Sequence, residues 1–152
     1  MTAAGPQADT FIVFGVAGTA YALPSRDVQH MEMVENVTRV PNAPSHVDGV
    51  VFSRGQVVPA MNLRARFGFE RAPYDLRSRL IVVQASGRSV GLIADDAREF
   101  IRINPAAIQP PQEAMAASGN DYISGIASID GRLVVILDLD RLMSLSEPLS
   151  TA

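Results

Sequence analysis

Short runs of apolar and β-branched residues, each closed by glycine or proline, recur along the whole chain. The first two, Thr10 to Val16 and Ala20 to Leu23, are separated by the turn Ala17-Gly18-Thr19. A longer run, Val28 to Val40, alternates loosely between apolar and polar positions. Because none of these runs shows a 3.6-residue apolar stripe, the pattern predicts β-strands joined by tight turns.

Two later segments, residues 47–64 and 123–140, repeat one pattern at a constant offset of 76 residues. The matched pairs are Gly49 with Gly125, Gly55 with Gly131, Val58 with Val134, Asn62 with Asp138, and Leu63 with Leu139. An offset that holds over so many positions indicates an internal duplication. Each copy is therefore expected to adopt the same local structure.

Each copy is predicted to form a β-hairpin followed by a short helix. Asp130-Gly131 suits the two positive-φ positions of a type I′ turn, whereas Ser53-Arg54-Gly55 predicts a looser turn. Both return strands end on an Asx residue, Asn62 or Asp138, followed by helix-forming residues. An Asx side chain at that place caps a helix by accepting a backbone N–H bond.

The strand pattern restarts after a charged segment at residues 70–78, so that residues 80–85 match the strand at residues 11–16. About five short strands in each half predict an all-β fold with short helices, built as two five-stranded β-barrels packed together. The predicted units are a disordered tail at 1–9, a first barrel at about 10–69, a second barrel at about 79–137, a closing helix at about 138–145 and a frayed tail at 146–152.

Composition excludes several classes of function. The 152 residues are 19% charged, with a net charge of −3, whereas nucleic-acid binders present a basic face. There is no cysteine, so disulfides and thiolate metal sites are excluded. No apolar run approaches the ~20 residues of a membrane span, and no secretory signal is visible. A cytoplasmic protein without a membrane-inserted segment is expected.

No arrangement of residues points to catalysis. The two histidines, His30 and His46, have no metal-binding spacing around them and are expected to pack in strands or loops. The acidic clusters Asp95-Asp96-Glu99 and Asp138-x-Asp140 are expected to cap strand ends, although paired carboxylates also perform acid–base catalysis. No nucleophile elbow or phosphate-binding loop occurs. We therefore expect no enzymatic activity, no cofactor and no metal.

Arg54 is the strongest candidate for contact with a partner. It lies at the tip of the first hairpin, where the repeat places Asp130. Arginine is enriched at interface hot spots, although an exposed turn arginine is also commonly a solvated charge. Arg64 and Arg66, in contrast, are expected to be solvated charges at a helix end.

The first hairpin also carries a family resemblance. Residues 49–68 read GVVFSRGQVVPAMNLRARFG, which resembles the signature of the CheW-like domain. That signature commonly reads glycine, two or three apolar residues, Asn-Leu-Arg-Gly, an apolar strand with proline, then Asp-Leu-Arg. Val90-Gly91-Leu92-Ile93 with Asp95, and residues 123–142, agree with the same family. The resemblance covers roughly Thr10 to Met143.

The resemblance implies an SH3-like double β-barrel and a non-enzymatic chemotaxis adaptor without a cofactor. The implied partners are the regulatory domain of a CheA-type histidine kinase and the cytoplasmic tip of methyl-accepting chemoreceptors, at membrane-associated receptor arrays. One half would bind the kinase domain, and the groove between the halves would take the receptor's helical tip. The candidate partner-binding residues are Val28, His30, Glu32, Phe52, Ser53, Arg54, Gly55, Val57 and Arg64.

The chain departs from the family pattern at four positions. Phe52-Ser53 stands where Asn-Leu is usual, Asn62 replaces the usual aspartate, and His30 stands near a position where familiar adaptors carry an acidic residue. A specialised adaptor of gliding, pilus motility or another chemosensory pathway is therefore an alternative. Two more distant alternatives are an OB-like nucleic-acid-binding module, which shares a five-stranded barrel, and an enzyme that uses Asp95-Asp96.

Overall fold

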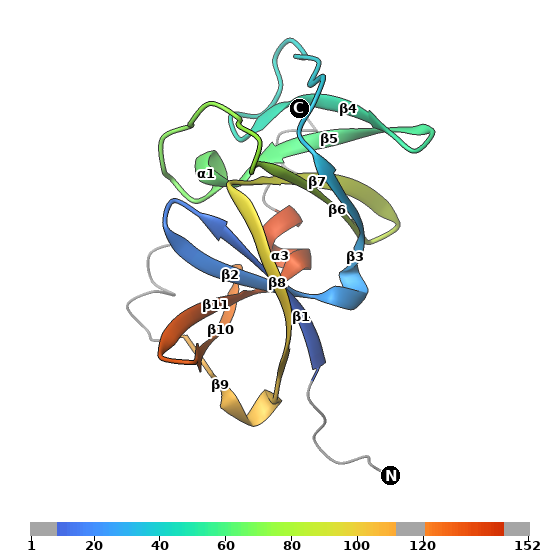
Figure 1. Cartoon of the computed structure of the whole chain (residues 1–152). Coiled ribbons are helices and arrows are strands. Elements are labelled where there is room, and N and C mark those ends of the chain that lie inside the picture. Colours follow the sequence, from blue (N-terminus) through green and yellow to red (C-terminus); the bar gives the residue numbers. More distant parts are fainter. Residues whose placement is uncertain (1–8, 112–120, 145–152) are drawn as a thin grey trace.

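The protein folds into two β-sheets with short helices between strands (Figure 1). The computed structural model describes residues 9–111 and 121–144. The six-stranded sheet has the order β8-β1-β2-β11-β10-β9, with β1 (Asp9–Val16), β2 (Thr19–Pro24), β8 (Asp96–Ile103), β9 (Ile108–Gln109), β10 (Ile123–Ile129) and β11 (Arg132–Leu137). The five-stranded sheet has the order β3-β6-β7-β5-β4, with β3 (Val28–Met33), β4 (Val47–Ser53), β5 (Gln56–Asn62), β6 (Arg79–Ala85) and β7 (Arg88–Ala94).

The helices in the described part of the chain are single turns or little longer. They are the 3₁₀ turns η1 (Ser25–Asp27) and η2 (Pro105–Ala107) and the α-helices α1 (Leu63–Arg66) and α3 (Leu139–Ser144). None of them is long and apolar enough to cross a membrane. The predicted all-β class with short helices is confirmed.

The strands exchange partners between the two sequence halves. The hairpin β1–β2 from the first half joins the six-stranded sheet through the parallel pairing of β2 with β11. The hairpin β6–β7 from the second half joins the five-stranded sheet through the parallel pairing of β5 with β7. Each sheet therefore contains strands from both of the predicted units, 10–69 and 79–137. Local patterns identify strands and antiparallel hairpins, but carry no signal for these two parallel pairings.

The two duplicated hairpins have identical turns. Positive φ angles occur at Arg54 (47°) and Gly55 (86°) in the first, and at Asp130 (52°) and Gly131 (80°) in the second. Two-residue loops with both φ angles positive are type I′ turns, which match the twist of the flanking strands. Ser53 belongs to β4 and pairs with the first residue of β5. The first turn is therefore as tight as the second, contrary to the prediction.

The predicted helix caps are confirmed at both junctions. The Oδ1 atoms of Asn62 and Asp138 accept hydrogen bonds from the backbone N–H three residues later, at 3.2 and 3.1 Å. The backbone N–H of Asn62 donates to the carbonyl of His46, and that of Asp138 to the carbonyl of Tyr122. These two carbonyls are again 76 residues apart, so the duplication includes the segment that precedes each hairpin.

Some element boundaries differ from the predictions. β3 ends at Met33 rather than at Val40, and the chain then turns back so that Thr38 forms an isolated bridge with Val50 of β4. The expected loop after Ile103 contains η2 and the two-residue strand β9. Asp9, expected in a disordered tail, begins β1. The rest of that tail, residues 112–120, residue 145 and the predicted tail at 146–152 lie outside the described residues.

The largest core cluster lies between the sheets and joins the two halves. Its aromatic centre contains Phe67, whose ring centroid lies 4.7 Å from that of Tyr21 and 5.3 Å from that of Tyr122. Arg66 covers the Tyr122 ring at 4.5 Å and donates from Nε to the carbonyl of Leu142 in α3. Burying side chains of this size stabilises a fold by roughly 1.5–3 kcal/mol each. Arg66 is therefore a packing residue, not the solvated charge that was expected.

Protonation of His46 is expected to destabilise the protein. His46 is only 9% exposed, and burial lowers its pKa, with a further lowering by the nearby charges of Arg66 and Arg71. His46 binds a proton more readily in the unfolded chain than in the folded protein. The free energy of unfolding is therefore highest above the ordinary histidine pKa and decreases as the pH falls through it. The melting temperature of the wild type should drop between pH 7.5 and pH 5.5. His46→Gln should flatten this drop; parallel curves for the two proteins would contradict the assignment.

Candidate partner-binding site

The two outer strands of the five-stranded sheet meet at a small polar cluster. Ser53 Oγ in β4 donates to Glu32 Oε2 in β3 at 2.5 Å. His30 Nε2 lies 2.8 Å from the same Glu32 oxygen and 2.9 Å from Ser53 Oγ. The sheet therefore curls until β3 and β4, which lie at opposite ends of the strand order, are in contact. The expectation that His30 and Glu32 share one face of a strand is confirmed.

The hydrogen bonds of this cluster do not form a pair of nucleophile and base. A carboxylate only accepts, so His30 Nε2 must carry a proton in its bond to Glu32. The Ser53 hydroxyl donates to Glu32 instead of to a histidine base, and Ser53 is only 1% exposed. The hydrogen bond from Ser53 lowers the pKa of Glu32, with further help from His30 and from the charge of Arg54. The cluster therefore fixes one negative charge close to the hairpin tip.

The tip of the β4–β5 hairpin presents apolar side chains and a cation to solvent. Phe52 and Val57 face each other across the two strands and are 72% and 64% exposed. Arg54 and Gly55 form the exposed turn beside them. Contiguous exposed apolar surface is a feature of interaction sites, and arginine is enriched at such sites, so the hairpin tip stays a candidate. The structure thus brings together Glu32, Phe52, Arg54, Gly55 and Val57, with His30 and Ser53 supporting them.

Two of the candidate residues lie elsewhere. Val28 is half-buried at the start of β3 and packs against the core between the sheets. Arg64 lies at the opposite end of β5 from the hairpin turn, and its guanidinium forms a two-pronged ion pair with Asp95 at 2.9 and 2.7 Å. The helix-end position of Arg64 is as expected, but the charge is paired rather than solvated.

Asp95 holds the junction between β7 and β8 in place. Burial raises its pKa, but the hydrogen bonds from Arg64 and from the Ala17 N–H outweigh burial and leave the pKa below the usual range. An aspartate held ionised by an arginine is a structural ion pair and is poorly suited to act as an acid or base. Among the described residues, no group of three or more histidine, aspartate or glutamate side chains is placed to hold a metal ion.

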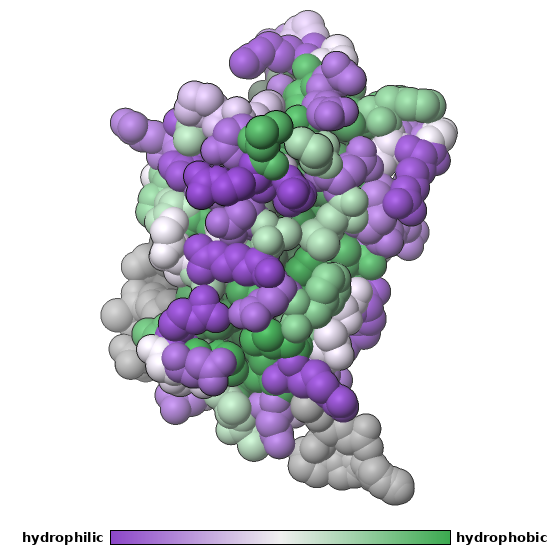
Figure 2. All heavy atoms as spheres, in the orientation of Figure 1, coloured by the Kyte–Doolittle hydropathy of each residue, from purple (hydrophilic) through white to green (hydrophobic). Residues whose placement is uncertain are grey.

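The seam between the sheets also reaches the surface. On the face seen in Figure 2, hydrophobic atoms gather along the middle of the molecule, between hydrophilic side chains. Met33 of β3 and Phe100 of β8 are 39% and 58% exposed. Exposed apolar side chains therefore occur on both sheets outside the hairpin tip.

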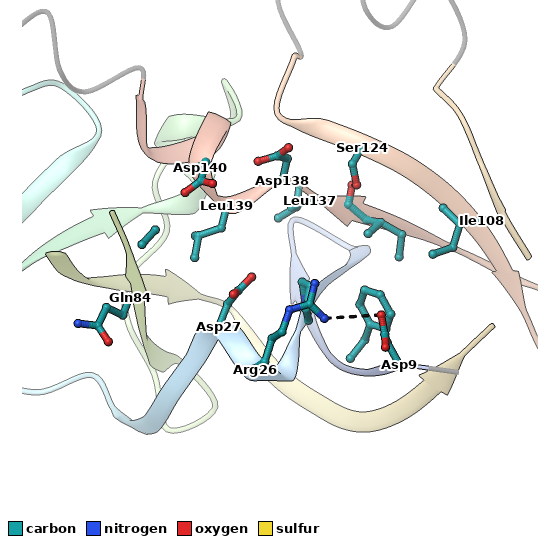
Figure 3. Close-up of a pocket in the computed structure, with 14 residues that line it drawn as sticks. Asp9, Arg26, Asp27, Gln84, Ile108, Ser124, Leu137, Asp138, Leu139 and Asp140 are labelled. Carbon is teal, nitrogen blue, oxygen red and sulfur yellow. Dashed lines mark hydrogen bonds and ion pairs between the residues drawn. The ribbon is translucent and has the colours of Figure 1, made fainter. Parts of the chain in front are cut away.

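A groove lies between the sheets (Figure 3). Its cavity volume is about 390 Å³. Its apolar lining residues come from both sheets and from α3: Phe11, Pro24, Ala85, Ile108, Ile136, Leu137 and Leu139, of which Pro24, Ala85 and Ile108 are half-buried and the others are buried. Its polar lining residues are mostly carboxylates: Asp9, Arg26, Asp27, Gln84, Ser124, Asp138 and Asp140. In Figure 3, Asp27 from η1 and Asp140 from α3 lie on the two sides of the opening.

The family resemblance implied a groove between the halves, but the sequence did not identify its residues. Asp138-x-Asp140 was expected only to cap, which Asp138 does. Asp27, far earlier in the chain, comes close to this cluster because β2 and β11 pair in parallel, with Ala22 opposite Ile136. No local sequence signal reports such a pairing.

Comparison with known proteins specifies the family to which this fold belongs. The family model described as the CheW-like domain matches residues 10–147. Over 137 residues the chain is 27% identical to the chemotaxis protein CheW of Klebsiella aerogenes, covering 90% of this chain and 82% of that protein. Over 142 residues it is 28% identical to protein FrzA of Myxococcus xanthus, covering 93% and 86%.

A solved structure gives the same result for the fold. The scaffolding protein TtCheW from Thermoanaerobacter tengcongensis superposes with a TM-score of 0.81 at 29% identity, over 93% of this chain and 92% of that one. The chain belongs to the CheW-like family. Within that family its similarity is to chemotaxis adaptors, so the resemblance seen in the sequence is confirmed.

Proposed function

We propose that the protein is a non-enzymatic adaptor that couples methyl-accepting chemoreceptors to a CheA-type histidine kinase, in the cytoplasm at receptor arrays. The observation that carries the proposal is the family match over residues 10–147, together with the relatives named as chemotaxis and scaffolding proteins. An adaptor needs two separate binding surfaces rather than a catalytic centre. The hairpin tip and the groove supply two such surfaces on different parts of the fold.

The hairpin tip is the proposed surface for the kinase's regulatory domain. Phe52 and Val57 offer an apolar contact that gains from being removed from water. Arg54 adds a guanidinium group that can form directional hydrogen bonds to a partner. Glu32 adds a carboxylate whose negative charge is stabilised by its neighbours, Arg54 included. A patch with both apolar and charged groups gives affinity and orientation together.

The groove is the proposed surface for the receptor's helical tip. Helix-in-groove docking requires apolar contact surface bordered by polar groups. The groove at the junction of the two sheets offers half-buried Pro24, Ala85 and Ile108 beside its carboxylates. The hairpin belongs to the five-stranded sheet, whereas the groove is lined mostly by the six-stranded sheet and α3. Both partners can then be bound at the same time.

Arg54→Ala should weaken binding of the kinase regulatory domain without affecting folding. The side chain is exposed and has no hydrogen bond within the described residues, so its loss should leave the melting temperature unchanged. A hot-spot arginine typically costs about 2 kcal/mol or more when truncated, roughly a thirtyfold loss of affinity. Isothermal titration of the two proteins measures this. Arg102→Ala, an exposed arginine on β8, is the matched control, and equal affinities for both variants would remove Arg54 from the site.

A specialised pathway is the second candidate. FrzA is among the similar proteins, which favours an adaptor with divergent partners. In this chain the acidic group beside the turn arginine is Glu32, two residues beyond the position of His30 where familiar adaptors carry it. Affinity capture from the native cell separates the two candidates by the identity of the kinase that is recovered.

A further inference from the structure

We propose that the groove between the sheets selects a partner helix carrying a long basic side chain, lysine or arginine, which enters between Asp27 and Asp140. The inference rests on the proposed function, since the helix is taken to be the receptor's tip. It adds the chemistry by which the groove recognises that helix.

The charge balance of the rim is the first argument. Four carboxylates and one guanidinium surround the groove. Arg26 reaches outward to Asp9, with 3.6 Å between Nη1 and Oδ2 (Figure 3). Asp138 Oδ1 accepts the backbone N–H of Arg141, and its Oδ2 lies 3.9 Å from the Arg141 side chain. Arg26 of the groove lining is thus paired with Asp9, and Asp138 with Arg141 from outside the lining.

Asp27 and Asp140 remain without a partner. Neither carboxylate has a hydrogen bond or an ion pair to any residue that the structure describes, although they come from different elements and face the same opening. Burial raises the pKa of Asp27 above its usual value, against the opposing effect of Arg26. The carboxylates of Asp140 and Asp138 raise it further. A bound cation between Asp27 and Asp140 would relieve this repulsion.

The apolar lining of the groove explains why the basic side chain must be long. Pro24 and Ala85 line the cavity and are half-buried, so that they still offer apolar surface to a ligand. Lysine and arginine bury an aliphatic stem along apolar surface while the charged end reaches a polar group. A helix in the groove would therefore place methylene groups on Pro24 and Ala85 and its charge between Asp27 and Asp140.

The test is binding of the cytoplasmic hairpin-tip fragment of a chemoreceptor from the same genome to the full-length protein. The double variant Asp27→Asn with Asp140→Asn should lose about tenfold or more in affinity at low salt, and its affinity should depend less on salt than that of the wild type. Asp27→Lys should weaken binding further. Asp130→Asn, which removes one carboxylate from an exposed hairpin turn outside the groove, is the control and should bind like the wild type.

Kinase binding separates this inference from the function on which it rests. The double variant should bind the kinase regulatory domain normally, because the hairpin tip is unchanged. Equal affinity of the double variant and the wild type for the receptor fragment would overturn the basic side-chain inference and leave the adaptor standing. Failure of the wild type itself to bind the fragment would instead overturn receptor coupling, and this inference with it.

Discussion

Gly49→Ala is expected to cause a large loss of stability, on the order of 3 kcal/mol, which is at the upper end for overpacking a well-packed site. An added Cβ would lie 2.1 Å from the carbonyl oxygen of Thr38. That carbonyl accepts from the Val50 N–H at 2.8 Å, and the Thr38 N–H donates back to the Val50 carbonyl at 2.9 Å. The backbone cannot move aside without breaking this bridge. Urea denaturation measures the change in the free energy of unfolding.

Gly55→Ala is the matched control in the same hairpin. A Cβ there meets no atom within 4 Å, so the only cost is the positive φ of 86°. That cost is about 1–2 kcal/mol. The account of Gly49 would be contradicted if its alanine variant were no less stable than Gly55→Ala. Gly125→Ala, at the repeat position of Gly49, should lose an intermediate amount of stability. The added Cβ would first meet the side chain of Ile108, at 2.4 Å, rather than a backbone atom.

Phe52→Asp is expected to weaken binding of the kinase regulatory domain by about a hundredfold or more, equivalent to roughly 2.7 kcal/mol. The substitution removes the most exposed aromatic ring of the hairpin and adds a carboxylate to an apolar contact close to Glu32. Burying an unpaired charge in an interface is costly, so the loss should exceed that for Arg54→Ala.

Stability should hardly change in this variant, because Phe52 is 72% exposed. Leu133→Asp is the control, since Leu133 is 66% exposed and occupies in the second hairpin the position that Val57 has in the first. Titration calorimetry with both variants gives the comparison. Wild-type affinity in Phe52→Asp would show that the kinase binds elsewhere on the fold.

The features that the sequence predicted correctly are those encoded by neighbouring residues. The Asp130-Gly131 turn follows from residues that tolerate positive φ, and the caps at Asn62 and Asp138 follow from side chains that reach their own backbone. The duplicated hairpin needs only these local signals and a run of apolar residues on each side. The family resemblance also rested on this hairpin.

The features that the sequence missed depend on contacts between distant segments. The parallel pairing of β2 with β11 places the β1–β2 hairpin in the sheet formed by strands of the second half, and it brings Asp27 close to Asp140. No local sequence pattern predicts this pairing. The contact of Ser53 with Glu32 needs the five-stranded sheet to curl. The prediction that Arg64 is solvated was wrong because its ion-pair partner, Asp95, lies between β7 and β8, 31 residues later in the chain.

The most direct test of the adaptor account is a three-component capture experiment. The receptor hairpin-tip fragment is immobilised, and retention of the kinase regulatory domain is measured with and without this protein. The account predicts that retention rises with added protein and saturates at one kinase domain per bound protein, and that Phe52→Asp remains on the receptor but fails to retain the kinase domain. Displacement of the protein from the receptor by the kinase domain would show that the two partners compete for one surface, and would contradict the adaptor mechanism.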